Sequence, residues 1–281
     1  MAKSIGILYI CTGPYYLFWE DFYKSFEKNF LPDTEKRYFV FTDASNIFAS
    51  ESDRVKVIKI INQPWPLITL LRFNTFLMIE PELLLCDYLM FSNANIICDK
   101  KVIEEEFLPR KSEKLFVTTH PGYYGKKIIE YPYDRNPKSL AYIPWNCGNY
   151  YVIGAMFGGT SQAFVEMSHK LKDNIAEDLK KNIIAKWHDE SHLNRYIIGR
   201  DDVRVLSPSY CYPYGMNVGY DKKISAVSKQ AKFDVNTFKG QYEQKRGLLR
   251  KVLGSIKRQI KIKERVMFMR DTILNKKISR I

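Results

Sequence analysis

Short apolar runs with two different spacings alternate over the first 80 positions. Strand-like runs occupy residues 5–11, 37–43 and 55–60, and the last of them alternates Val and Ile with Lys. The segments 17–30 and 67–79 are longer and carry their apolar residues at the spacing of a helix with one buried face. We therefore expect strands and helices to alternate from the start of the chain.

The run DYLMFSNANII (87–97) is apolar over most of its length. A continuous apolar strand is typical of the middle of a parallel sheet covered on both faces, because neither side of such a strand meets water. Residues two positions apart in a strand share a face, so Asn93 and Asn95 would point the same way at its carboxyl end. Ligands of doubly wound α/β sheets bind at this edge. The pattern predicts a doubly wound α/β domain with a ligand site near the two asparagines.

The second half of the chain begins with a turn-rich stretch and then becomes regular again. The spacing predicts helices over 161–182 and 187–198, and VRVLSPSY (203–210) predicts a last strand that ends in a Ser-Pro turn. The Gly-Gly pair in NYYVIGAMFGGT (149–160) indicates, by itself, a bend. Residues 241–281 place apolar residues at helical spacing among Lys and Arg, which predicts a basic amphipathic tail outside the main domain, residues 1–240.

Composition and charge exclude several classes of protein. Apolar residues make up 46% of the 281 positions, which is enough for a buried core and excludes a disordered chain. The net charge of +13 is concentrated in the tail, where thirteen Lys and Arg face three acids, so the domain itself is nearly balanced. A nucleic-acid-binding protein would explain the tail, but the domain lacks a stacking or groove-reading motif.

The cysteines and the N-terminus predict a cytoplasmic protein. The five cysteines are odd in number and never form a CxxC pair, which favours reduced thiols over a disulfide framework or a zinc site. The N-terminal run IGILYI is that of a first strand rather than a signal peptide, and no stretch reaches the roughly 18 apolar residues of a membrane span.

Single motifs leave the chemistry open. His188 and His192 lie four apart and could share a metal on one helical face, but the acids at Asp189 and Glu190 do not give the HExxH order of zinc hydrolases. The chain has no G-x-G-x-x-G or Walker loop, which argues against a Rossmann dehydrogenase and a P-loop NTPase.

In their order along the chain, however, the motifs resemble glycosyltransferase family 6. They are YFVFTD, DYLMFSNAN, HPGYYG, YDRNPKSLAYIP, GNYYVIGAMFGGT, WHDESHLNRY and VLSPSY, and the resemblance extends from about Ile5 to Lys229. This family contains the blood-group A and B transferases, α1,3-galactosyltransferase, the Forssman synthase and bacterial relatives. The resemblance implies an α/β fold of the GT-A type with a mixed sheet, a UDP-sugar donor and retention of the α configuration.

The asparagine pair places this chain with the bacterial branch. Vertebrate members carry a DVD triplet where this chain has Asn93-Ala94-Asn95, and the bacterial branch is marked by NxN. A metal held by two aspartates spreads the negative charge of the leaving diphosphate. Neutral amides alone, in contrast, bind a hard divalent cation only weakly. Amides can still donate hydrogen bonds to phosphate or sugar hydroxyls. We therefore expect catalysis without a metal or another cofactor, with side-chain cations supplying the missing charge.

The resemblance also implies roles for single residues. Glu190 is expected beneath the anomeric carbon, as the nucleophile of a double displacement or as the support of an ion pair in a front-side mechanism. His120 and Trp187 are expected to bind the acceptor, by a hydrogen bond and as an apolar wall. The expected donor-binding residues are Tyr15 against uridine, Arg72 and Lys229 as the cations, Asn93, Asn95, Ile153, Gly154, Ala155 and Asp189.

The donor, the acceptor and the role of the tail stay open. In the blood-group pair, alanine at the position of Ala155 favours UDP-galactose, although the Forssman enzyme has alanine there and uses UDP-GalNAc. The acceptor is expected to be a galactoside such as Fucα1,2-Gal. An inactive relative that only binds sugars is the alternative, and Glu190, Asp189 and His120 together argue against it.

The basic tail predicts a second interaction. We expect residues 241–281 to lie on the anionic cytoplasmic face of a bacterial inner membrane, in place of the N-terminal anchor of vertebrate members. There the enzyme would extend a lipid-linked surface glycan. Packing of the tail on the domain, or pairing with another subunit, is the alternative, and the sequence leaves the oligomeric state undetermined.

Overall fold

The computed structural model describes residues 3–235 of the 281-residue chain. The chain divides into two compact units, residues 1–233 and 234–281, and the first unit contains the helices and strands described below. The predicted tail 241–281 and its membrane-surface role lie outside the described residues and stay predictions. Within residues 3–235, no helix is long and apolar enough to cross a bilayer.

A seven-stranded mixed sheet forms the centre of the first unit, in the order β3-β2-β1-β4-β7-β6-β8. The parallel half contains β1 (Ser4–Ile10), β2 (Glu35–Thr42), β3 (Val55–Lys59) and β4 (Tyr88–Ser92). The other half contains β6 (Leu115–Thr119), β7 (Val152–Thr160) and β8 (Val203–Leu206), with β7 antiparallel to both β4 and β6. The predicted mixed sheet is confirmed.

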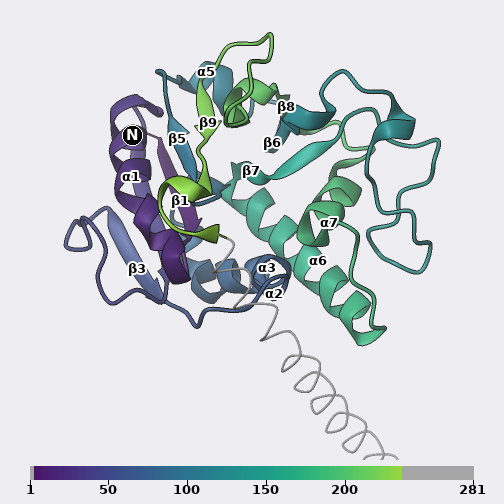
Figure 1. Ribbon diagram of the computed structural model, residues 1–281, viewed down its shortest axis with the longest axis horizontal. Coiled ribbons are helices and arrows are strands. Elements are labelled where there is room, and N and C mark those ends of the chain that lie inside the picture. Colours follow the sequence, from purple (N-terminus) through teal and green to yellow (C-terminus); the bar gives the residue numbers. More distant parts are fainter. Residues whose placement is uncertain (1–2, 236–281) are drawn as a thin grey trace, which may run out of the picture. The chain divides into compact units, whose positions relative to one another are not determined.

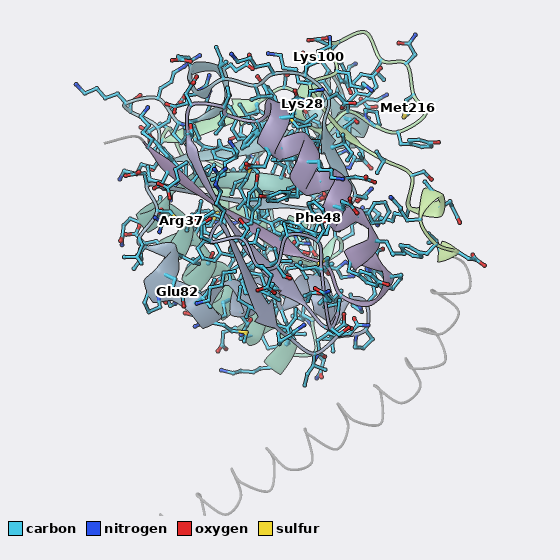
Figure 2. All side chains as sticks on the ribbon, turned by 90° about the vertical axis from the view of Figure 1, so that its left-hand side faces the viewer. Lys28, Arg37, Phe48, Glu82, Lys100 and Met216 are labelled. Carbon is cyan, nitrogen blue, oxygen red and sulfur yellow. The ribbon has the colours of Figure 1, made fainter. Side chains whose placement is uncertain are left out.

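Helices cover both faces of this sheet (Figure 1). Helix α1 (Trp19–Asn29) packs on one face of the sheet, which is the face that Figure 2 shows. In that view Lys28 marks the last turn of the helix, and Phe48, from the loop after β2, lies nearer its first turn. Helices α6 (Ser161–Lys180) and α7 (His188–Ile197) contribute to the core on the opposite face. Alternate residues of β1 enter the two cores, Ile7 and Tyr9 on the side of α1 and Leu8 on the side of α6. The central strands β1 and β4 are buried over almost their whole length because both of their faces are covered.

The segment 67–79 does not form the single helix that its spacing predicts. It forms α2 (Leu67–Leu70), α3 (Arg72–Phe76) and the 3₁₀ turn η2 (Leu77–Ile79), followed by α4 (Glu80–Leu83). The backbone of Leu71 has turn-like angles (φ −93°, ψ 8°), which interrupt the helix. The predicted buried face is nevertheless correct, because Leu70, Phe73 and Phe76 are all buried.

The predicted continuous strand 87–97 is also wrong in its second half. β4 ends at Ser92, residues 93–95 form a turn, and β5 (Ile96–Cys98) pairs antiparallel with β9 (Ile224–Ala226) in a separate small sheet. The predicted Ser-Pro turn is confirmed, because β8 ends at Leu206 and Pro208–Cys211 forms a 3₁₀ turn. However, β9 comes later in the chain, so β8 is not the last strand. A short helix, α5 (Glu104–Phe107), connects β5 to β6.

The glycine pair of AMFGGT lies inside β7 rather than at a bend. Gly158 and Gly159 face the backbones of both neighbouring strands so closely that a Cβ would collide with the carbonyl oxygens of Leu89 and Lys114. Glycine is therefore required here for close backbone approach and not for a turn.

Candidate active site

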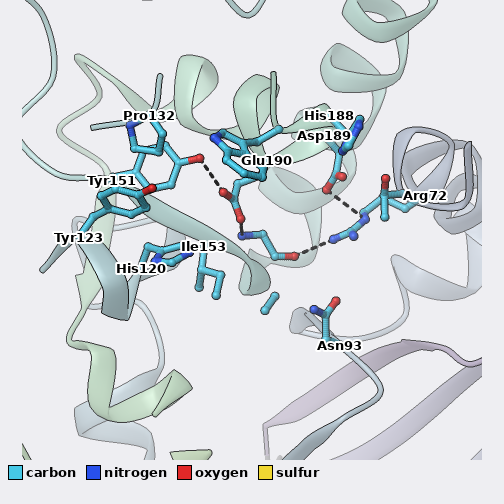
Figure 3. A pocket seen from close by; sticks show the side chains of 14 residues that line it. Arg72, Asn93, His120, Tyr123, Pro132, Tyr151, Ile153, His188, Asp189 and Glu190 are labelled. Atoms are coloured by element: carbon cyan, nitrogen blue, oxygen red, sulfur yellow. Dashed lines mark hydrogen bonds and ion pairs between the residues drawn. The ribbon is translucent and has the colours of Figure 1, made fainter. Parts of the chain in front are cut away.

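A cavity of about 360 Å³ opens where β4 and β6 end and β7 begins, with α3 and α7 beside it (Figure 3). Nine of the predicted site residues line it: Arg72, Asn93, His120, Ile153, Gly154, Ala155, Trp187, Asp189 and Glu190. The cavity is also lined by Thr69, Tyr123, Pro132, Tyr151 and His188. The structure thus gathers residues that are up to 121 positions apart in the sequence (Thr69 to Glu190) around one space.

The scaffold of the cavity is a bulge in β7. Val117 of β6 pairs with Phe157, but the next residue, Thr118, pairs with Ile153, so residues 154–156 have no partner on β6. Backbone groups freed by a bulge are available to other partners. The Gly154 N–H donates to Glu190 Oε2 (2.7 Å), and the Gly154 carbonyl accepts from Arg72 Nη1 (2.6 Å). A single peptide segment therefore holds side chains from both α3 and α7.

Glu190 is held at both carboxyl oxygens. Besides the bond from Gly154 to Oε2, the hydroxyl of Tyr151 donates to Oε1 at 2.6 Å (Figure 3). Burial raises the pKa of Glu190 from 4.5 to about 7, because the charged form loses water, and the two hydrogen bonds oppose this rise. Burial therefore favours the protonated carboxyl group of Glu190 more than in a glutamate exposed to water.

Asp189 and Arg72 form a buried ion pair beside Glu190. Arg72 Nε lies 3.1 Å from Asp189 Oδ2, and both side chains are less than a tenth exposed. The guanidinium also lies over the ring of Phe91, 4.4 Å from its centroid. Burial raises the pKa of Asp189 to about 6, and the positive charge of Arg72 opposes this. Arg72 thus reaches the cavity as predicted, but Asp189 already balances its charge.

Helix α7 is fixed to β7 by Asn194. Its Nδ2 donates to the Val152 carbonyl (2.9 Å), and its Oδ1 accepts from the Val152 N–H (3.0 Å). The same Nδ2 lies 2.9 Å from the Glu190 carbonyl oxygen, one helical turn back. The amide therefore sets the distance between the start of α7 and the bulge. Sequence reasoning did not assign a role to Asn194, although its i+4 spacing from Glu190 places it on the same helical face.

The two histidines of WHDESH do not share a site. The ring of His188 packs against that of Trp65 (centroids 4.8 Å apart) at the cavity, whereas His192 is buried with its Nε2 3.6 Å from Asp178. Within the described part of the chain, no three His, Cys, Asp or Glu side chains are grouped so that they could hold a metal ion. The geometry required for a shared zinc ion at His188 and His192 is absent.

His120 and Trp187, the two predicted acceptor-binding residues, both line the cavity. His120 Nδ1 accepts a hydrogen bond from the Gly122 N–H (3.0 Å), and burial lowers the pKa of its imidazole to about 4. A neutral imidazole whose Nδ1 accepts carries its proton on Nε2, which can donate to a hydroxyl group. Trp187 is 46% exposed and offers an apolar ring surface.

Three predicted residues do not line the cavity. The side chain of Asn95 donates to the Val227 carbonyl (2.8 Å), so it connects the end of β4 to the chain after β9 instead of pointing with Asn93 into the cavity. Lys229 Nζ lies 5.3 Å from the centroid of the Tyr15 ring. The structure thus brings Tyr15 and Lys229 together, outside the cavity, and their roles at the donor stay predictions.

Tyr151 is the residue that the sequence prediction missed most clearly. It is 1% exposed and lines the cavity with its hydroxyl on Glu190. Its position does carry a sequence signal, because Tyr151, Ile153 and Ala155 alternate along one strand and would share one face. All three line the cavity.

Comparison with known proteins identifies the family. The family model described as glycosyltransferase family 6 matches residues 1–237. The chain belongs to glycosyltransferase family 6. The family resemblance of the sequence motifs is thereby confirmed, as is the mixed α/β fold that it implied.

Relatives of this family 6 glycosyltransferase occur in bacteria and in animals. The O-antigen biosynthesis glycosyltransferase WbnI of Escherichia coli is 36% identical over 226 residues, which cover 80% of this chain and 95% of that protein. The histo-blood group ABO system transferase 2 of Rattus norvegicus is 31% identical over 219 residues, 74% of this chain and 63% of the rat protein. The globoside alpha-1,3-N-acetylgalactosaminyltransferase 1 of Gallus gallus is 28% identical over 74% of this chain and 62% of the chicken protein. The chain therefore spans less than two thirds of these animal relatives.

Proposed function

We propose that this family 6 glycosyltransferase moves galactose or N-acetylgalactosamine from a UDP-sugar to the 3-hydroxyl of a galactoside, with retention of the α configuration and without a metal ion. Glu190 carries the proposal. Its carboxyl group is held by two hydrogen bonds at the wall of a 360 Å³ cavity, and a buried ion pair lies directly beside it. Such a fixed carboxylate can support the positive charge that develops on an anomeric carbon, or attack it.

Ala155 supports UDP-galactose as the slightly favoured donor. Its methyl group lies on the bulge, in the cavity wall next to Gly154, and is 6% exposed. A methyl group at this point would take space from the N-acetyl group of a bound UDP-GalNAc. One methyl group is worth only about 1–3 kcal/mol of discrimination, so UDP-GalNAc stays the second candidate donor, in keeping with the names of the animal relatives.

The leaving diphosphate would be stabilised by donors and cations of the chain itself. Asn93 lines the cavity at the end of β4 and can offer its amide N–H groups to a phosphate oxygen. Arg72 adds little surplus charge because Asp189 balances it. We therefore assign the main compensating charge to Lys229, beside the ring of Tyr15 that we propose for uridine.

The acceptor and the setting are proposed from the relatives. The named role of the E. coli relative is O-antigen biosynthesis, which supports a bacterial surface glycan as the product. We propose a Fucα1,2-Gal-containing acceptor, bound between the Nε2 proton of His120 and the ring of Trp187 at the open side of the cavity.

UDP release tests this function. The chain is incubated in EDTA with UDP-galactose or UDP-GalNAc, with and without a Fucα1,2-galactoside, and the product's anomeric configuration is read by NMR. We expect acceptor-stimulated release with at least one donor and an α1,3-linked product. Donor binding without release would instead favour the alternative of a sugar-binding relative, and release that requires an added divalent metal would refute metal-free catalysis.

The tail is proposed to bring this activity to a membrane surface. Residues 241–281 carry thirteen Lys and Arg and three acids, and such segments are attracted to anionic lipids. Co-sedimentation with phosphatidylglycerol-containing vesicles should fall with rising salt and disappear on truncation after Gly240. Binding retained by the truncated chain would refute this role, whatever the enzymatic activity.

A further inference from the structure

Tyr151 lies in a rigid aromatic setting directly behind the central carboxylate. The side chain is 1% exposed and packs against the rings of Tyr123 (5.2 Å between centroids), Tyr133 (5.5 Å) and His120 (5.7 Å). These contacts leave the phenol little freedom to rotate away. Its hydroxyl group ends 2.6 Å from Glu190 Oε1.

We propose that Tyr151 is a positioning residue that fixes the plane of the Glu190 carboxylate and favours its anionic form. This proposal rests on the function proposed for Glu190 in sugar transfer. Tyr151 itself need not touch the sugar at the reacting carbon, and it acts through Glu190.

The geometry of the two donors supports this role. Tyr151 donates to Oε1 and the Gly154 N–H donates to Oε2, so each oxygen is held from a different point and the carboxyl plane is fixed. Both bonds are made to acceptor oxygens, which an ionised carboxylate offers and a protonated one offers less well. Of the two donors, only the tyrosine hydroxyl can be removed by a side-chain substitution.

Other charged and titratable groups around Glu190 affect its ionisation in both directions. The neighbouring carboxyl group of Asp189 disfavours the anion, whereas the guanidinium of Arg72 favours it. The remaining titratable groups that face this site are Tyr123, His120, His188 and Cys211. None of these groups occupies the position of the Tyr151 hydroxyl on Oε1, so its loss should be visible above their effects.

Tyr151→Phe tests the proposal, with Tyr133→Phe as the matched control. Tyr133 is equally buried and its hydroxyl donates to the Tyr150 carbonyl rather than to Glu190. The protein is labelled with ¹³C at the glutamate carboxyl carbon, and the resonance of Glu190 is identified by its loss in Glu190→Gln. We expect a titration midpoint near 7 in the wild type and in Tyr133→Phe, and a midpoint about one unit higher in Tyr151→Phe.

The kinetic result should follow the titration. UDP release by Tyr151→Phe should show a kcat lower by roughly 10- to 100-fold at pH 7, with the donor KM nearly unchanged. The loss should shrink as the pH rises past the new midpoint. A loss of equal size at all pH values, or a carboxyl titration equal to that of the wild type, would overturn the proposal.

Two features keep the test decisive. If Tyr151→Phe unfolds, Tyr151 can be replaced by 3,5-difluorotyrosine, which keeps the shape and is a stronger donor, and the Glu190 midpoint should then move below that of the wild type. An unchanged midpoint would overturn the proposal in this variant too. If the midpoint moves as expected but the wild type releases no UDP from either donor, the link between Tyr151 and Glu190 stands and the proposed transferase reaction fails.

Discussion

Gly154→Ala places one methyl group at the centre of the site without changing any charge. A Cβ at Gly154 would lie 3.2 Å from Glu190 Cβ and 3.5 Å from Asp189 Oδ2. Carbon atoms pack best at about 3.5–4.0 Å. Either Glu190 or the bulge must therefore move by a few tenths of an ångström.

Glu190 cannot avoid this contact by rotating its side chain, because its Cβ is attached directly to the backbone of α7. Asn194 fixes that helix to Val152 through two hydrogen bonds, so the displacement is transmitted to the carboxylate. A misplacement of about 1 Å costs roughly 10²-fold in rate, which predicts a fall in kcat of about 3- to 10-fold. The added methyl should also destabilise the fold by about 1–3 kcal/mol.

Steady-state UDP release and thermal unfolding separate these two effects. Gly158→Ala serves as the control, because its Cβ would collide with the Leu89 carbonyl and the ring of Phe116, away from the cavity lining. We expect Gly158→Ala to lose stability far more than Gly154→Ala does, and Gly154→Ala to lose kcat while it remains folded. A folded Gly154→Ala enzyme with the wild-type kcat would refute the view that the bulge sets the position of Glu190.

Three further changes probe the charge, the helix attachment and the donor. Glu190→Gln should lower turnover by roughly 10²–10³-fold, and a wild-type rate of UDP release would remove Glu190 from the reaction. Because burial raises the pKa of Glu190 above its value in the unfolded chain, to about 7, its contribution to stability declines as the pH rises from about 4.5 to about 7. The Tm of the wild type should therefore fall relative to that of Glu190→Gln over this range, and parallel Tm curves would contradict the raised pKa. Asn194→Ala leaves the buried N–H and C=O of Val152 without their side-chain partner. Urea titrations should show a free energy of unfolding that is lower by about 1–3 kcal/mol. An unchanged urea midpoint would show that the attachment of α7 to β7 through Asn194 is dispensable. Ala155→Gly should raise the kcat/KM ratio of UDP-GalNAc to UDP-galactose by at least roughly tenfold, and an unchanged ratio would exclude Ala155 as a donor determinant.

The sequence pattern was reliable where burial alone decides the structure. The strands β1 and β2 and the helices α1, α6 and α7 coincide with predicted elements, because an apolar run or an apolar helical face must be buried somewhere. The pattern was unreliable where contacts with other segments of the chain determine the secondary structure. The strand predicted over 87–97 ends at Ser92, and Ile96–Cys98 pairs with β9 in a separate small sheet.

The same division holds for the site. The resemblance of the sequence motifs to the family pointed to nine of the residues that line the cavity. They did not indicate that Arg72 would pair with Asp189, or that Tyr151 would hold Glu190. Both contacts depend on distances between segments that are far apart in the chain.

The sequence by itself therefore determined the succession of strands and helices, the family, and the residue types available for chemistry. Only the tertiary structure decided how these residues act on one another. The deciding element is the bulge at residues 154–156, where the pairing of β7 with β6 shifts its register between Val117 and Thr118. Pairing register is a property of the two paired strands together, so it is not encoded in the local pattern of either one.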